Sequence, residues 1–174
     1  MHSAPAAEMP ARVSTADLLF GDFAGEHVAT RRTLERYPEG KGDWRPHDRS
    51  RTLAELASHV ADLVNRGTLV LETEGLDVAS RAPQPTMNSA PELLAHFDAG
   101  LRRFNAALAT ADIDRLNGDW AMRRGGQVLM VQPRRVLLRL MMMSHLVHHR
   151  AQLGVYYRLL GVAVPGAYGP SADD

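Results

Sequence analysis

Three of the eight histidines of this chain fall within five positions near its C-terminus, at His145, His148 and His149. Neutral imidazole is a common protein ligand for zinc, nickel and related divalent ions. Residues four apart on a helix lie about 40° apart around its axis, and residues three apart lie about 60° apart in the other direction. Both the His145–His149 pair and the His145–His148 pair could therefore project toward one metal ion.

The neighbouring apolar residues favour one of these pairs. His149 lies near the centre of an apolar arc around His145, whereas His148 lies toward the edge of that arc. We therefore expect His145 and His149 to face the interior of the protein and His148 to flank the site. The residues that define the arc lie within about 60° of His145 on a regular helix, and they are Leu138, Met141, Met142, Gln152 and Tyr156.

Two histidines make a weak metal site, and a third ligand facing inward would make it more specific. The best-placed candidate is His59, in the middle of an amphipathic segment, where an unpaired imidazole would cost free energy. On the pattern alone, His59 could equally be a histidine at the core edge that bonds a neighbour such as Asp62. We expect His27 and His96 at the boundary of the core, and His47 in a solvent-exposed loop.

No residue stands out as a catalytic acid or base. Glu55 and Asp62 lie one turn on either side of His59, and we expect both to be solvated surface charges. A histidine that binds a metal through one ring nitrogen needs an acceptor for the other nitrogen. Gln152 or Asp62 could supply that acceptor.

The composition narrows the chemistry and the partners. The chain has no cysteine, so a metal site must use histidine, carboxylates or water, and a cysteine nucleophile is excluded. Its 20 Lys and Arg residues equal its 20 Asp and Glu residues, whereas nucleic-acid-binding proteins usually show a clustered basic surplus. No stretch approaches about 18 consecutive apolar residues. We expect a cytoplasmic protein that binds neither nucleic acid nor membrane.

The chain length of 174 residues suits one domain, and its 45% of hydrophobic residues argues against disorder. Residues 1–12 lack the apolar core of a signal peptide, and we expect them to form a flexible tail. The single domain is expected to span residues 13–174.

Helix signals place the histidines on two separate elements. A first helix is predicted over residues 15–37, with a start at Ser14 that resembles a capping box. The second is predicted from about residue 50 or 52 to Gly75, and it carries His59.

The second half of the chain gives two more helices. Ser89 predicts the start of a third helix that ends near residue 111. Residues 112–132 break the helical pattern around Gly125-Gly126, which predicts a small hairpin or an extended crossover. The last helix is predicted from Pro133 to about residue 160. We therefore expect an all-α four-helix bundle with one short non-helical crossover before the last helix.

With these residues in view, the chain resembles the DinB/YfiT-like family of small proteins proposed to be metal-dependent enzymes. The resemblance extends from the first helix to the last residue. Three motifs carry it: the segment DWRPHDRSRTLAELASHVADL that leads into the second helix, the pattern HxxxHRxQ from His145 to Gln152, and the ending VP…YGPSAD. The combination is specific, whereas HxxxH alone is not.

The resemblance implies an up-down-down-up four-helix bundle that forms a homodimer. It also implies one divalent metal ion held by His59 on the second helix and by His145 and His149 on the last, and the chain shows no departure from the family at these positions. Zinc or nickel suits three imidazoles first, and iron, copper and manganese stay open.

The resemblance leaves the reaction open, because some relatives look like transferases that use a low-molecular-weight thiol and others look like isomerases or hydrolases. We expect first a metal-dependent transfer between a low-molecular-weight thiol and a small-molecule substrate. Two alternatives stay open on the sequence. The protein could be a metal-dependent hydrolase, because such an ion lowers the pKa of bound water to about 7. It could also be a non-catalytic, stress-associated metal-binding protein in which the ion joins the second and last helices.

Overall fold

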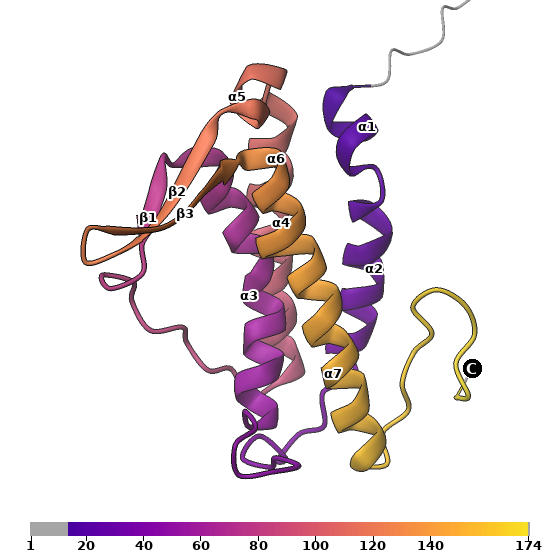
Figure 1. Ribbon diagram of the computed structural model, residues 1–174. Coiled ribbons are helices and arrows are strands. Elements are labelled where there is room, and N and C mark those ends of the chain that lie inside the picture. Colours follow the sequence, from indigo (N-terminus) through magenta and orange to yellow (C-terminus); the bar gives the residue numbers. More distant parts are fainter. Residues whose placement is uncertain (1–13, 174) are drawn as a thin grey trace, which may run out of the picture.

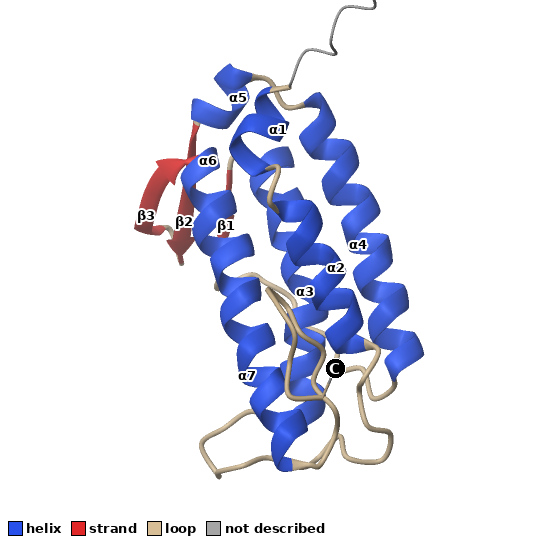
Figure 2. Ribbon diagram, turned by 90° about the vertical axis from the view of Figure 1, so that its right-hand side faces the viewer, coloured by secondary structure: helices blue, strands red, loops and turns tan. Residues whose placement is uncertain are grey.

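Four long helices pack side by side as a bundle in the computed structural model, which describes residues 14–173 (Figures 1 and 2). The expected tail at residues 1–12 lies outside the described part. The helices are α2 (Phe23–Leu34), α3 (Leu53–Glu72), α4 (Ala90–Thr110) and α7 (His145–Leu159). Helices α3 and α4 run in one direction, and α2 and α7 run in the opposite direction (Figure 1).

Local sequence explains where the two central helices begin. The Thr52 hydroxyl accepts a hydrogen bond from the Glu55 N–H, and the Glu55 carboxylate accepts one from the Thr52 N–H, which forms a capping box. Ser89 caps α4 in a similar way through the N–H of Glu92. The predicted start of α4 is confirmed, and α3 begins directly after Thr52.

The predicted first helix is interrupted, so the expectation of one continuous helix is wrong. A short α1 (Thr15–Phe20) ends at Gly21, and α2 begins after Asp22. Arg139, from the last helical region of the chain, donates hydrogen bonds to the Leu19 carbonyl and to the Asp22 carboxylate at this break. This contact is distant in sequence, and local helix signals cannot indicate it.

A small three-stranded sheet lies beside one end of the bundle, so the all-α expectation is wrong in this respect (Figure 2). Strand β2 (Asp119–Arg124), which follows the short helix α5 (Ile113–Asn117), pairs antiparallel with β3 (Gln127–Pro133). This is the predicted hairpin. Strand β1 (Gly75–Asp77) pairs parallel with β2 and was not predicted, because its partner lies 46 positions later in the chain (121 − 75).

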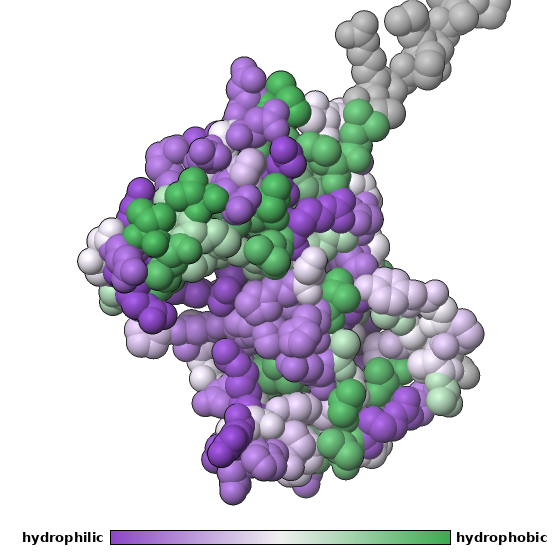
Figure 3. Space-filling view, in the orientation of Figure 1, coloured by the Kyte–Doolittle hydropathy of each residue, from purple (hydrophilic) through white to green (hydrophobic). Residues whose placement is uncertain are grey.

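Two glycines and one carboxylate shape the hairpin turn. Gly125 and Gly126 have φ of 55° and 84°, a left-handed region that favours glycine and suits a tight two-residue turn. The Asp77 carboxylate accepts hydrogen bonds from both of their N–H groups, which ties β1 to the turn. Exposed apolar side chains gather on this side of the molecule (Figure 3). On the edge strand β3 they are Val128, Leu129 and Val131.

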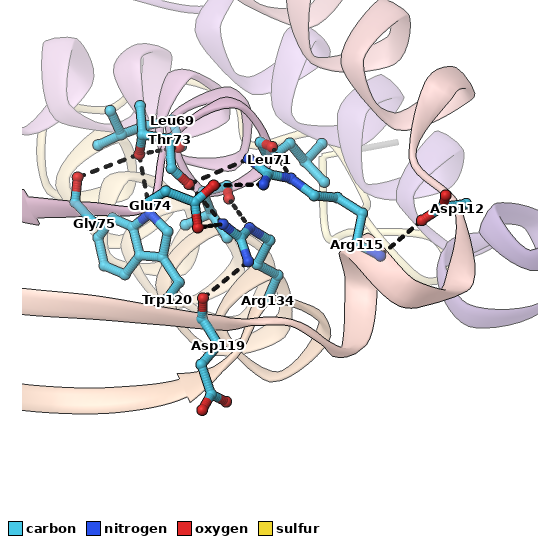
Figure 4. Close-up of polar contacts among 11 residues, drawn as sticks. Leu69, Leu71, Thr73, Glu74, Gly75, Asp112, Arg115, Asp119, Trp120 and Arg134 are labelled. Atoms are coloured by element: carbon cyan, nitrogen blue, oxygen red, sulfur yellow. Dashed lines mark hydrogen bonds and ion pairs between the residues drawn. The ribbon is translucent and has the colours of Figure 1, made fainter.

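Two arginines close the end of α3 next to the sheet (Figure 4). The last carbonyls of a helix lack intrahelical donors and carry the negative end of its dipole. Arg134 is 2% exposed, and it donates to α3 carbonyls and forms an ion pair with Glu74. Arg115 does the same from α5. The accepting carbonyls are those of Val70, Leu71 and Thr73.

His27 lies in the core, so its predicted place at the core boundary is wrong. Its ring contacts Phe23, Phe97 and Phe104 with centroid separations of 6.0, 6.3 and 5.9 Å. Among the described residues, its Nε2 has no hydrogen-bond partner. Burial lowers the pKa of His27 from 6.5 to about 4, and the charge of Glu26 partly opposes this shift.

None of the helices in residues 14–173 combines the length and the apolar character that a membrane-spanning helix needs.

We expect Arg134→Met to lower the free energy of unfolding by about 3 kcal/mol, because α3 carbonyls at this buried position lose their donor. Urea denaturation measures this change. Arg135→Met is the matched control, since Arg135 is exposed and donates to the Asn117 side chain; its effect should stay within about 0.5 kcal/mol. Equal effects of the two substitutions would contradict the role given to Arg134.

The buried His27 predicts that acid destabilises the fold. Its pKa in the folded state is about 4 and its ordinary value is 6.5, so the unfolded chain binds more protons between these values. The free energy of unfolding should therefore fall as pH drops from about 6.5 to about 4, by on the order of 3 kcal/mol from this residue. His27→Phe should flatten this pH dependence, and the exposed His47→Phe should not. Identical pH profiles for wild type and His27→Phe would refute the assignment.

Candidate metal centre

His59, His145 and His149 lie together where α3 packs against α7. One ring nitrogen of each lies within 4.8 Å of the corresponding nitrogens of the other two. The Nε2 atoms of His59 and His145 are 3.2 Å apart. His59 is 3% exposed, whereas the other two rings are half-buried. His148 is exposed and lies outside the cluster, in line with its predicted flanking position.

The helix that carries two of these histidines is not α-helical throughout. After the short α6 (Arg134–Leu137), a π-helical segment η1 (Leu138–Ser144) leads into α7 directly before His145. Such segments are frequent at functional sites. The prediction of one regular helix was wrong here, but the four-residue spacing of His145 and His149 lies wholly within α7. Their common orientation therefore follows from α-helical geometry.

Each of the three imidazoles has a hydrogen-bond partner outside the cluster. Nδ1 of His59 lies 3.2 Å from Oε1 of Gln84, and Nδ1 of His149 lies 2.7 Å from Oε1 of Gln152. His145 forms a hydrogen bond with the backbone of Met141. An amide oxygen only accepts, so Nδ1 of His59 and of His149 carries the proton and Nε2 keeps the lone pair. The prediction that Gln152 is such an acceptor is confirmed.

Gln84 was missed by sequence reasoning. It lies in the irregular segment between β1 and α4, where no periodicity marks a residue as inward-facing. The same segment contacts α3 at a second point, since the Met87 N–H donates to the Ser58 hydroxyl at 2.7 Å. Ser58 directly precedes His59, so this segment is held against α3 beside the ring that Gln84 orients.

The surroundings keep the three rings neutral. Burial is the largest cause, and it lowers the pKa of His59 and of His145 from 6.5 to about 4 and that of His149 in the same direction. The positive charge of Arg66 lowers all three values further, and that of Arg51 lowers those of His59 and His149. Near neutral pH the imidazoles therefore present lone pairs that can bind a metal.

The arrangement fits a divalent metal ion. Two Nε2 lone pairs that face each other repel unless a proton or a cation lies between them. Nitrogens bound to one tetrahedral zinc at about 2.0–2.1 Å lie roughly 3.3 Å apart. The 3.2 Å separation of the His59 and His145 nitrogens matches this value. Three such ligands would leave at least one position open for a further ligand.

The two acidic residues considered near His59 are engaged elsewhere. The exposed Glu55 belongs to the cap of α3. Asp62 is only 9% exposed, so the expectation of a solvated charge is wrong for it. Its carboxylate pairs with Arg81 at 3.2 Å and with His96 at 3.0 Å. Asp62 therefore does not serve as the acceptor for a ring of the cluster.

A cavity of about 440 Å³ opens beside the cluster. A second cavity of about 410 Å³ lies under the C-terminal segment, and none of the three histidines lines it. Trp44 packs edge-on against Tyr156 with a centroid separation of 5.5 Å and covers the core nearby. The cavity beside the cluster is lined by Arg49, Ser50, Arg51, Leu56, His149, Gln152, Val155 and Tyr156.

Two of the sequence motifs hold the C-terminal segment in place. Arg150, directly after His149, is buried and forms an ion pair with Glu26 of α2 at 2.7 Å. The Tyr168 hydroxyl joins both groups, since it accepts from Arg150 at 2.8 Å and donates to Glu26 at 3.1 Å. These contacts fix α7 against α2 and so help to fix the orientation of His149.

The Nδ1 contacts predict that an acceptor controls metal affinity without being a ligand. We expect Gln84→Leu to weaken zinc binding by roughly 10–100-fold, because His59 loses the partner that sets its ring orientation and its tautomer. Competition with a zinc indicator dye measures the affinity. Gln127→Leu, on an exposed position of β3, is the control and should leave the affinity unchanged. Equal affinities of Gln84→Leu and wild type would show that this contact plays no part.

Comparisons with known proteins identify relatives of the fold and of the sequence. Two crystal structures of DinB-like proteins share the fold. The structure from Bacillus subtilis has 18% sequence identity and a TM-score of 0.67, and the match covers 86% of this chain and 96% of that chain. The structure from Bacillus cereus has 21% sequence identity and a TM-score of 0.68, and the match covers 90% of this chain and 100% of that chain. No curated protein matches the chain. The family model of the DinB family matches residues 9–174. The chain therefore belongs to the DinB family.

Proposed function

We propose that the protein binds one divalent metal ion through His59, His145 and His149 and catalyses a transfer reaction between a low-molecular-weight thiol and a small-molecule substrate. The observation that supports this most directly is the cluster of three neutral imidazoles with converging nitrogens beside a cavity. A divalent ion there would supply Lewis acidity that favours the ionised form of a bound thiol or water. Zinc or nickel is proposed first, and iron, copper and manganese are compatible with the ligands.

The residues of the chain would orient and shield the reacting groups. His59 is held by Gln84 and His149 by Gln152, so both rings are fixed before a ligand arrives. His149 also lines the cavity, which gives a small molecule access to the cluster from that side. The apolar side chains of Leu56, Val155 and Tyr156 in the cavity wall would accommodate the carbon skeleton of a substrate.

The placement of the acidic residues favours the thiol transferase over the hydrolase. The cluster contains no carboxylate, and Asp62 is paired with Arg81 and His96. A free thiol has a pKa of about 8.5 and free water one of about 15.7, so on the same ion a thiol needs the help of a proton acceptor less than water does. The hydrolase is the second candidate, because three imidazole ligands also suit an ion that lowers the pKa of water.

We further propose that the protein is a cytoplasmic homodimer. Membership of the DinB family supports this through the resemblance described above. The apolar side chains on the edge strand β3 would suit a contact between two copies, because exposed apolar groups on a sheet edge favour association. The balanced formal charge supports a role that involves no nucleic acid.

The proposal predicts thiol-dependent turnover by the metal-loaded protein. Glutathione, mycothiol or bacillithiol is offered with 1-chloro-2,4-dinitrobenzene, whose chloride the thiolate displaces to form a thioether, and the product is followed by absorbance. We expect His149→Ala to lower the rate by roughly 100-fold or more, because a metal ligand is lost. The exposed His148→Ala is the control and should retain the rate.

Three results distinguish the alternatives. Turnover that is unchanged in His149→Ala would sink the transferase proposal. Ester hydrolysis that needs no thiol and rises with pH near neutrality would favour the hydrolase. A large drop of the melting temperature with a chelator, without turnover of any substrate, would favour an ion that only joins α3 and α7.

A further inference from the structure

Two arginines that form no ion pair within residues 14–173 lie before and after His59 in the sequence. Arg66 lies seven positions after His59 (66 − 59), so it projects from nearly the same side of the helix, about two turns further on. Arg51 lies eight positions before His59 (59 − 51), just before the start of α3. Side chains on an α-helix lean toward its N-terminus, so the side chain of Arg66 leans toward His59. Arg51 lines the same cavity as His149.

The side chain of Arg66 is partly buried and forms no ion pair with the described residues. Its Nε is inaccessible to solvent and has no hydrogen-bond partner among the described residues. It takes part in none of the ion pairs found within residues 14–173. The nearest acid that acts on it is Asp62, whose carboxylate already pairs with Arg81 and His96. A buried guanidinium without an acceptor costs free energy, so a bound ligand that supplies the acceptor would account for it.

The cavity beside His149 also has positively charged side chains in its wall. Arg49 and Arg51 form part of its wall, and neither belongs to an ion pair of the described residues. The wall also has three apolar side chains, Leu56, Val155 and Tyr156. Its other members are Ser50, His149 and Gln152. A molecule that fills this space and reaches the histidines would meet apolar groups and positive charge. An anion with a short carbon skeleton matches both.

We propose that the thiol used at this site carries a carboxylate and that Arg66 binds this carboxylate, with Arg51 as a second cation. A guanidinium pairs with a carboxylate through two parallel hydrogen bonds, and the single negative charge balances one arginine. The inference rests on the proposed function, because it places the carboxylate next to the metal that the histidines would hold.

The first test compares two probes that differ only in charge. Cobalt-loaded protein is titrated with 3-mercaptopropionate and with 3-mercaptopropionamide, and the cobalt–thiolate absorbance gives both dissociation constants. In wild type the acid should bind about tenfold more tightly than the amide, because the charged hydrogen bonds to Arg66 add to the thiolate contact. Arg66→Met should reduce this ratio to near one, Arg51→Met should reduce it in part, and Arg102→Met, an exposed arginine on α4, should leave it unchanged.

The cobalt content of each protein separates the two proposals. Wild type that holds cobalt but shows a ratio near one, or a ratio that survives in Arg66→Met, would overturn the role of Arg66 and leave the metal site standing. Wild type that holds no cobalt would overturn the proposed function. A ratio that Arg51→Met abolishes and Arg66→Met leaves intact would also overturn the assignment to Arg66.

The second test needs no metal. Propionate should raise the melting temperature of metal-free wild type above the value measured with propionamide, and this difference should vanish in Arg66→Met. Arg66→Met without ligand should be at least as stable as wild type, because an unpaired buried cation is removed. A marked loss of stability in Arg66→Met would instead indicate a structural role for Arg66. An equal response of both proteins to propionate would show that Arg66 does not bind the carboxylate.

Discussion

The packing of α3 against the helix that runs through η1 and α7 is the contact on which the site depends. One imidazole comes from α3 and two come from α7, 86 positions later in the chain (145 − 59), so neither helix forms the cluster alone. Each helix is fixed by groups outside the cluster. Arg134 binds the C-terminal end of α3, and Arg150 joins α7 to Glu26 of α2. These buried arginines fix the two helices, and the helices in turn hold the three neutral rings close together.

The sequence predicted the parts of the fold that short-range signals specify. The capping residues Thr52 and Ser89 placed the starts of α3 and α4, and the glycine pair at 125–126 placed a hairpin. Strand β1, the break between α1 and α2, and the burial of His27 were missed. Each of these depends on a partner distant in the chain: β2 for β1, Arg139 for the break and three phenylalanines for His27.

The residues of the site also fall into two groups, those that the sequence predicted and those that depend on contacts distant in the chain. The four-residue spacing predicted that His145 and His149 share a side of their helix. The amphipathic pattern made His59 the best third candidate and the family resemblance selected it; the structure brings these three together. Gln84 was not predictable, because it lies in an irregular segment and meets His59 only after that segment folds against α3. Nor does the sequence mark η1 or the unpaired Arg66. The resulting centre has neutral nitrogen donors with arginines nearby, an environment that favours a bound anion next to the histidines.

We propose that histidines from two helices hold one divalent metal ion. Elemental analysis of purified wild type, His59→Ala and His148→Ala, each loaded with zinc and then freed of excess metal, measures whether they do. Circular dichroism first establishes that all three are folded. We expect about one equivalent of metal in wild type and in His148→Ala, and little or none in His59→Ala. Wild type without metal at any divalent loading, or equal metal content in wild type and His59→Ala, would contradict it.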